Sequence, residues 1–169
     1  MLRAEPRDSG PAASAAAFLA GLQEENAALV AFKRTLHAAQ EALVEGDADR
    51  LGQLATDMAS HIDLLARLGE QRSRHLAAQN LSAGAEGMAA WLKRNPEHAA
   101  TGNKTWRELL AQAETSQQIN QNNGVLIETR LQQNRLNLAV LQTVAASDGV
   151  YRPDGKMHPL RNTRTFSQV

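Results

Sequence analysis

The side chains that most often carry chemistry are few in this chain of 169 residues. It has no cysteine, which excludes disulfides, thiolate nucleophiles and cysteine-based zinc or iron–sulfur sites. Asp57 and His61 stand four residues apart, so a helix would place both on one face, as a pair of metal ligands requires. A pair without further ligands is more often a surface hydrogen bond. The five histidines are spread over the whole chain, at His37, His61, His75, His98 and His158.

Two other patterns lack the surroundings that catalysis needs. Gly84 and Gly87 do not follow a predicted strand, so they do not form a phosphate-cradling loop. Ser14, Ser60 and Ser73 are not flanked like the nucleophile of a hydrolase. We therefore expect a protein that is not an enzyme and holds no metal or cofactor. A bundle enzyme with a hidden metal or small-ligand site is the alternative that elemental analysis would test.

Charge and hydropathy limit the kinds of partner that the protein could bind. Lys and Arg number 18 and Asp and Glu number 18, so the chain has no net field to hold nucleic acid or an anionic membrane. No run approaches the roughly 20 apolar residues of a membrane span. Arg3 and Arg7 precede an alanine-rich stretch as in a signal peptide, but Glu5 and Asp8 interrupt the positive region. We expect a cytoplasmic protein without nucleic-acid binding or direct membrane insertion.

Composition predicts helices throughout. Apolar residues make up 43% of the chain but aromatic residues only 4%, and β-branched residues are sparse. All five prolines lie near the ends or at one interior break, which leaves residues 12–95 and 97–152 free to form helices. We predict an all-α fold, an antiparallel bundle of long coiled-coil-like helices, three long and one short. Its expected organisation is a disordered segment 1–13, a single bundle domain 14–146 and a flexible tail 147–169.

The sequence predicts that the first two helices form a hairpin. A seam of residues at alternating steps of four and three, with Glu25 as its one polar member, predicts a coiled-coil-like first helix: Phe18, Leu22, Glu25, Leu29, Phe32, Leu36, Ala39 and Leu43. Gly46 and Asp47 then form a helix end and an acidic N-cap. The second helix continues until Asn80, antiparallel to the first because the turn is short.

Two further helices follow. Ser82 is the expected N-cap of a short third helix, which halts at Asn95 because Pro96 follows. A long fourth helix is expected after Thr101-Gly102-Asn103, with a bend or a close helix crossing at Gly124. Its expected seam is a single row of residues: Trp106, Leu110, Ala113, Gln117, Asn120, Gly124, Ile127, Leu131, Asn134, Leu138, Leu141 and Ala145.

The amides in that row admit two interpretations. A buried amide needs a hydrogen-bond partner, so Gln117, Asn120 and Asn134 either line a wet end of the bundle and fix its register, or mark a side left open. In the second case the open side accepts a helix from another chain. The sequence leaves both interpretations standing.

Three stretches carry a family resemblance. Residues 120–128 read N-Q-N-N-G-V-L-I-E, followed by Q-N-R at 133–135 and by Leu138 and Leu141. Residues 151–156 read Y-R-P-D-G-K, and residues 64–72 read L-L-A-R-L-G-E-Q-R. Together they resemble the FlgN family of flagellar type III export chaperones, with Arg152 standing where that family usually has glycine.

That resemblance implies a chaperone that binds the terminal helices of the hook-associated proteins FlgK and FlgL. It would prevent their premature assembly and deliver them to the export gate and its ATPase complex. The implied client-binding residues are Asn120, Asn123, Gly124, Ile127, Leu131, Asn134, Leu138 and Leu141. The implied export-gate contact is Tyr151 with Asp154 and Gly155, although Tyr151 could instead fold back and cap the fourth helix.

The sequence is also compatible with two other outcomes. A generic helical-bundle adaptor or scaffold would show the same periodicity without any role in export. The exposed apolar row also makes a homodimer through the fourth helix possible.

Overall fold

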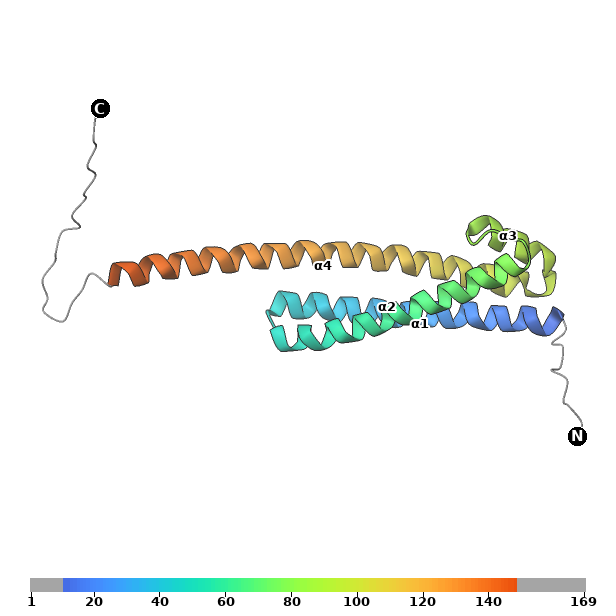
Figure 1. The fold of residues 1–169 in the computed structure, drawn as a ribbon, viewed down its shortest axis with the longest axis horizontal. Helices are drawn as coiled ribbons and strands as arrows, with labels where there is room; N and C mark the ends of the chain where they lie inside the picture. The colour runs from blue at the N-terminus through green and yellow to red at the C-terminus, as the bar shows by residue number, and fades with distance from the viewer. Residues whose placement is uncertain (1–10, 149–169) are drawn as a thin grey trace, which may run out of the picture. The chain divides into compact units, whose positions relative to one another are not determined.

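The computed structural model describes residues 11–148, and these are almost entirely helical, with no strand among them. Three helices are long, α1 (Pro11–Glu45), α2 (Ala48–Ala78) and α4 (Ala99–Asp148), and α3 (Ala85–Arg94) is short (Figure 1). A single 3₁₀ turn at Pro96–His98 joins α3 to α4. The predicted all-α fold with three long helices and one short helix is confirmed.

The described helices divide into two compact units, one ending at Leu126 and one beginning at Ile127. The first unit holds α1, α2, α3 and the first half of α4. The second holds the remainder of α4. None of the helices within residues 11–148 is both long enough and apolar enough to cross a membrane.

The turn between α1 and α2 forms as the sequence predicts. Gly46 adopts the left-handed φ of 77°, and the backbone N–H groups of Gly46 and Asp47 both donate to the Ala42 carbonyl, at 2.9 and 3.0 Å. The Asp47 side chain accepts a hydrogen bond from the Arg50 N–H at 2.9 Å and caps α2. The two helices consequently run side by side in opposite directions (Figure 1).

The seam predicted for α1 is the face that α1 buries. Seven of its eight members are buried and Phe32 is half-buried; the buried ones are Phe18, Leu22, Glu25, Leu29, Leu36, Ala39 and Leu43. The main core forms where the start of α1, the end of α2, α3 and the start of α4 meet. Trp91, Met88 and Leu76 are completely buried there. Burying side chains of this size contributes roughly 1.5–3 kcal/mol each.

Asn80 closes α2 as expected, in the left-handed conformation with φ 58°. The Leu81 N–H donates to the Leu76 carbonyl at 2.9 Å, which satisfies the end of the helix. The predicted N-cap role of Ser82 is wrong, because α3 is capped by Gly84 without a side-chain hydrogen bond. The carbonyl of Ser82 instead lies so close to Gly87 that a Cβ on residue 87 would come within 1.7 Å of its oxygen. Gly87 is therefore required by this close backbone approach.

α4 begins at Ala99, earlier than predicted, so Thr101, Gly102 and Asn103 are helical and do not form a turn. Gly102 allows α4 to approach α3, since a Cβ there would lie 2.7 Å from Cδ2 of Leu92. The close crossing predicted at Gly124 is wrong, because a Cβ on Gly124 would meet nothing within 4 Å. α4 passes through Gly124 as one helix of 50 residues, about 75 Å long.

Candidate functional site

Within the first unit, α4 buries a row of residues one position before the predicted seam. The buried members are small, polar or aliphatic: Gly102, Thr105, Leu109, Ser116, Ile119 and Asn123. The predicted seam is exposed over the same stretch, at Leu110, Gln117, Asn120 and Gly124. Neighbouring residues differ by about 100° around a helix, so the buried face of α4 is rotated by about 100° from the predicted face.

The contact between α4 and α1 is partly polar. Asn123 is buried, and its Nδ2 donates to the Leu36 carbonyl on α1 at 2.9 Å. Nearer the start of α4, Nδ2 of Asn26 donates to Oε2 of Glu108 at 3.4 Å. These two contacts advance together along both helices, so α1 and the first half of α4 run in the same direction. Asn120, Asn123 and Gly124 all belong to the predicted client-binding set. Asn123 is buried, whereas Asn120 and Gly124 are exposed.

The second unit exposes a continuous apolar row on α4. Ile127, Leu131, Leu138 and Leu141 are 46, 52, 57 and 63% exposed, and Asn134 stands exposed among them. The steps of four and three between these five residues are the core spacing of a coiled coil. We call these five residues the 127–141 row. The row is the face that a partner helix would cover in a coiled coil.

A second group of apolar side chains lies on the other side of the same helix. Leu136 and Val140 are 59 and 62% exposed. At about 100° per residue, Leu136 points about 140° away from Leu131 and about 160° away from Leu138. This group lies outside the single heptad row predicted from the sequence, although a count of apolar positions around the helix indicates it.

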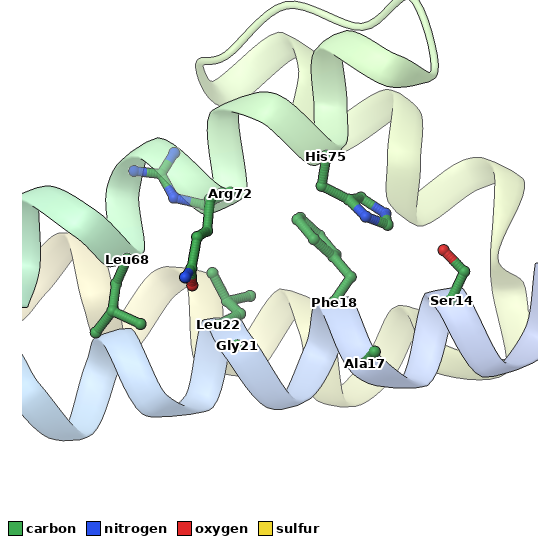
Figure 2. Close-up of a pocket in the computed structure, with 9 residues that line it drawn as sticks. Ser14, Ala17, Phe18, Gly21, Leu22, Leu68, Arg72 and His75 are labelled. Carbon is green, nitrogen blue, oxygen red and sulfur yellow. The ribbon is translucent and has the colours of Figure 1, made fainter. Parts of the chain in front are cut away.

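A cavity of about 220 Å³ lies between α1 and α2 in the first unit (Figure 2). Phe18 of α1 stacks on His75 of α2, with ring centroids 4.2 Å apart, and also contacts Trp91 at 4.5 Å. Burial lowers the pKa of the His75 imidazole from its ordinary value of 6.5. The ring nitrogen Nε2 of His75 lies 2.9 Å from Nε2 of Gln79, so the two form a hydrogen bond.

Beside this cavity, Arg72 binds the one acidic residue in the seam of α1. Its Nε donates to Oε2 of Glu25 at 2.8 Å and its Nη2 donates to Oε1 at 3.2 Å. Nη1 of Arg72 donates to the Ala83 carbonyl at 3.2 Å, and its guanidinium carbon lies 5.2 Å from the centre of the Trp106 ring. Arg72 therefore makes its charged contacts within the protein. These contacts link α1, α2, α4 and the loop before α3.

The residues that the sequence offers as metal ligands do not form a metal-binding cluster. His61 packs against Phe32 with ring centroids 6.2 Å apart, whereas Asp57 is exposed. Over residues 11–148, His, Asp and Glu side chains do not gather in a group of three that could hold a metal ion. Tyr151, Asp154 and Gly155, the predicted export-gate contact, lie outside the described residues.

The described residues form helices, and the long last helix, α4, carries an exposed row with coiled-coil spacing. The family model described as FlgN protein matches residues 14–159. The chain therefore belongs to the FlgN family, a family of flagellar export chaperones, and the resemblance seen in the sequence is confirmed. Comparison with curated proteins and with solved structures gave no match.

Proposed function

We propose that this chain is the cytoplasmic chaperone of the hook-associated proteins FlgK and FlgL. It binds their amphipathic terminal helices, keeps them from assembling before export and delivers them to the type III export gate. The observation that carries the proposal is the exposed 127–141 row, since a chaperone for helical segments needs an apolar face of helical spacing.

Four aliphatic side chains supply the binding surface in this proposal. Together with Asn134, Ile127, Leu131, Leu138 and Leu141 follow steps of four and three, so the four aliphatics match the apolar stripe of an amphipathic helix on both sides of that amide. Asn134 sits in the middle of the row and gives the complex a preferred register at some cost in affinity. Asn123 is left out of the contact, because its amide is already bonded to Leu36 inside the first unit.

The affinity must allow release at the gate. A dissociation constant between micromolar and nanomolar, about 8–12 kcal/mol, is suited to a client that is first held and then handed over. A helix laid along the row buries less than the roughly 800 Å² per partner of a standard interface unless flanking residues take part. Leu136 and Val140, on the other side of α4, are available for a second helix of the same client.

Direct binding tests the proposal. Purified FlgK or FlgL is titrated into the full-length chain by calorimetry, and the double variant Leu131→Asp/Leu141→Asp is compared with the parent. We expect saturable binding to the parent and a loss of at least a hundredfold in the variant, because two charges would be placed in an apolar contact. Equal affinity of both chains for FlgK and FlgL would refute the proposal.

The gate contact is assigned to Tyr151 with Asp154 and Gly155, on the strength of the family resemblance. Tyr151→Ala is expected to weaken contact with the export gate while client affinity stays within about twofold, since aromatic side chains often dominate small contacts. Loss of both activities would show that the two surfaces are not separate. A chain cut before Ser147 that still binds its clients and still supports export would favour the scaffold alternative.

A further inference from the structure

We propose that the cavity between α1 and α2 binds a single neutral aromatic ring that carries a hydrogen-bonding group, such as a phenol. The residues that line the cavity belong to the first unit, whereas the 127–141 row belongs to the second. The inference is therefore independent of the proposed client. The volume of the cavity, its stacked ring pair and its polar lining each support one part of it.

The volume of the cavity limits the size of its ligand. The cavity measures about 220 Å³, and an engineered protein cavity of about 150 Å³ holds one benzene molecule. The remaining space fits a small substituent on the ring. Three buried side chains give the cavity an apolar wall, namely Phe18, Leu22 and Leu68. Such a wall favours a ligand with apolar surface to remove from water.

Small residues of α1 leave this space open. Ala17 and Gly21 line the cavity one helical turn apart, and a Cβ on Gly21 would meet nothing within 4 Å. The packing of α1 on α2 therefore does not require glycine at residue 21. The space beside Gly21 is available to a ligand.

Two stacked rings line one side of the cavity. Phe18 of α1 and His75 of α2 have ring centroids 4.2 Å apart and an interplanar angle of 17°. Figure 2 shows Phe18 and Ser14 pointing from α1 toward α2, with the ring of His75 between them. A further ring gains energy from such a pair by stacking or edge-to-face contact, beyond the burial of its apolar area. An aliphatic ligand of the same volume lacks this gain.

His75 supplies a hydrogen-bond donor to the cavity. Its Nε2 lies 2.9 Å from the amide nitrogen of Gln79, which can only donate, so a neutral His75 carries its proton on Nδ1. Burial lowers the pKa of His75, which keeps the ring neutral near pH 7. Nδ1 makes no hydrogen bond to any residue within 11–148. The ligand therefore needs an acceptor, and the amide of Gln71 in the lining can accept from the hydroxyl of a phenol.

The charge of the lining disfavours an anionic ligand. Among the residues within 11–148 that line the cavity, Arg72 is the one charged side chain, and it already binds both carboxylate oxygens of Glu25 at 2.8 and 3.2 Å. A carboxylate in the cavity would lose water without gaining a free cation. A phenol stays neutral at pH 7, because its pKa is about 10. Such a ring can reach the cavity as a free small molecule or as a tyrosine side chain of another protein.

Small probes test the site in the full-length chain. An isotope-labelled sample at about pH 7.5 is titrated with p-cresol, toluene and p-toluate, and the amide chemical shifts are followed by NMR. We expect p-cresol to bind with a dissociation constant of about 1 mM. Its affinity should exceed that of toluene at least about fivefold because of the hydrogen bond, and that of p-toluate at least about tenfold because of the charge.

Three variants locate the probe and the donor. Gly21→Leu places a side chain in the open space of the cavity, and we expect the affinity for p-cresol to fall at least about tenfold. Gly52→Leu is the matched control, because a Cβ there also meets nothing within 4 Å and residue 52 is not part of the lining. It should stay within about twofold of the parent. His75→Phe keeps a ring beside Phe18 and removes the donor, so p-cresol and toluene should then bind within about twofold of each other.

Any of three results would overturn this inference: p-cresol shifts that do not saturate, equal affinity of the parent and Gly21→Leu, or p-cresol that binds the parent no more tightly than toluene or p-toluate. N-acetyl-tyrosinamide distinguishes the two sources of the ring. Affinity at least equal to that of p-cresol would assign the cavity to a tyrosine side chain, and weaker affinity would assign it to a free phenol. The 127–141 row is unchanged in every variant, so these outcomes do not depend on whether FlgK or FlgL binds.

Discussion

Arg72 clamps both carboxylate oxygens of Glu25, with its Nε 2.8 Å from Oε2 and its Nη2 3.2 Å from Oε1. The side chains are 18 and 9% exposed, so the pair lies largely out of water. Glu25 is the only charged member of the α1 seam, and the structure shows how the bundle accommodates it. The cost of desolvating the two charges is offset only while both partners are present.

Removing one partner of this pair should be costly. Arg72→Met leaves the Glu25 carboxylate buried without its cation, and we expect the free energy of unfolding to fall by about 3 kcal/mol. Glu25→Leu combined with Arg72→Met removes both charges and should recover at least half of that loss. Urea unfolding followed by circular dichroism at 222 nm measures both variants. A double variant as unstable as Arg72→Met would show that the charge is not the cause.

The position of the turn predicts the register of the α1–α2 hairpin. Phe18 and His75 are equidistant from the turn between Gly46 and Asp47, and so are Phe32 and His61. The two pairs are separated by two heptads on each helix, so the turn alone sets which residues meet. Arg72 and Glu25 depart from this equidistant pairing by one helical turn.

His75 should make the bundle sensitive to mild acid. Burial lowers its pKa below 6.5, so the unfolded chain binds a proton at His75 more readily than the folded chain does. Stability contributed by the neutral ring is complete above about pH 6.5 and is lost as the pH falls through that value. His75→Phe keeps an aromatic ring beside Phe18 and removes the titration. The drop in melting temperature between about pH 7.5 and pH 5.5 should therefore be smaller in the variant, by a few degrees. An equal drop in both proteins would contradict this account.

Two glycines should respond to alanine in opposite ways. A Cβ on Gly124 meets nothing within 4 Å, so Gly124→Ala should stabilise α4 by about 0.5–1 kcal/mol. A Cβ on Gly87 would lie 1.7 Å from the Ser82 carbonyl oxygen, so Gly87→Ala should destabilise the protein by at least about 2 kcal/mol. Thermal unfolding of the two variants measures both effects. A destabilised Gly124→Ala would mean that this glycine serves a close contact after all.

The site was less predictable than the fold. Periodicity located the exposed members of the 127–141 row, because their spacing is a property of the sequence. It did not predict which face of α4 meets α1. Thr105, Ser116 and Asn123 are polar and were not expected to be buried, yet they form the buried row. Gly102 and Leu92 decide that rotation through a contact between α4 and α3, which no local pattern encodes.

The two apolar sides of α4 provide a matched test of where a client helix lies. Leu138 belongs to the 127–141 row and is 57% exposed, whereas Leu136 lies on the other side and is 59% exposed. Leu138→Asp and Leu136→Asp therefore make the same chemical change at almost equal exposure on one helix. Any general effect of the added charge on helix stability should be similar in both.

We expect Leu138→Asp to weaken the affinity for a FlgK terminal-helix peptide by about 30-fold or more, because the carboxylate would be desolvated in the contact without a partner. Leu136→Asp should change the affinity by less than about threefold if a single client helix uses the row alone. Fluorescence anisotropy with labelled peptide gives both constants, and circular dichroism checks that the helices remain formed. Comparable losses in both variants would place client helices on two sides of α4, whereas a loss confined to Leu136→Asp would move the binding face away from the 127–141 row.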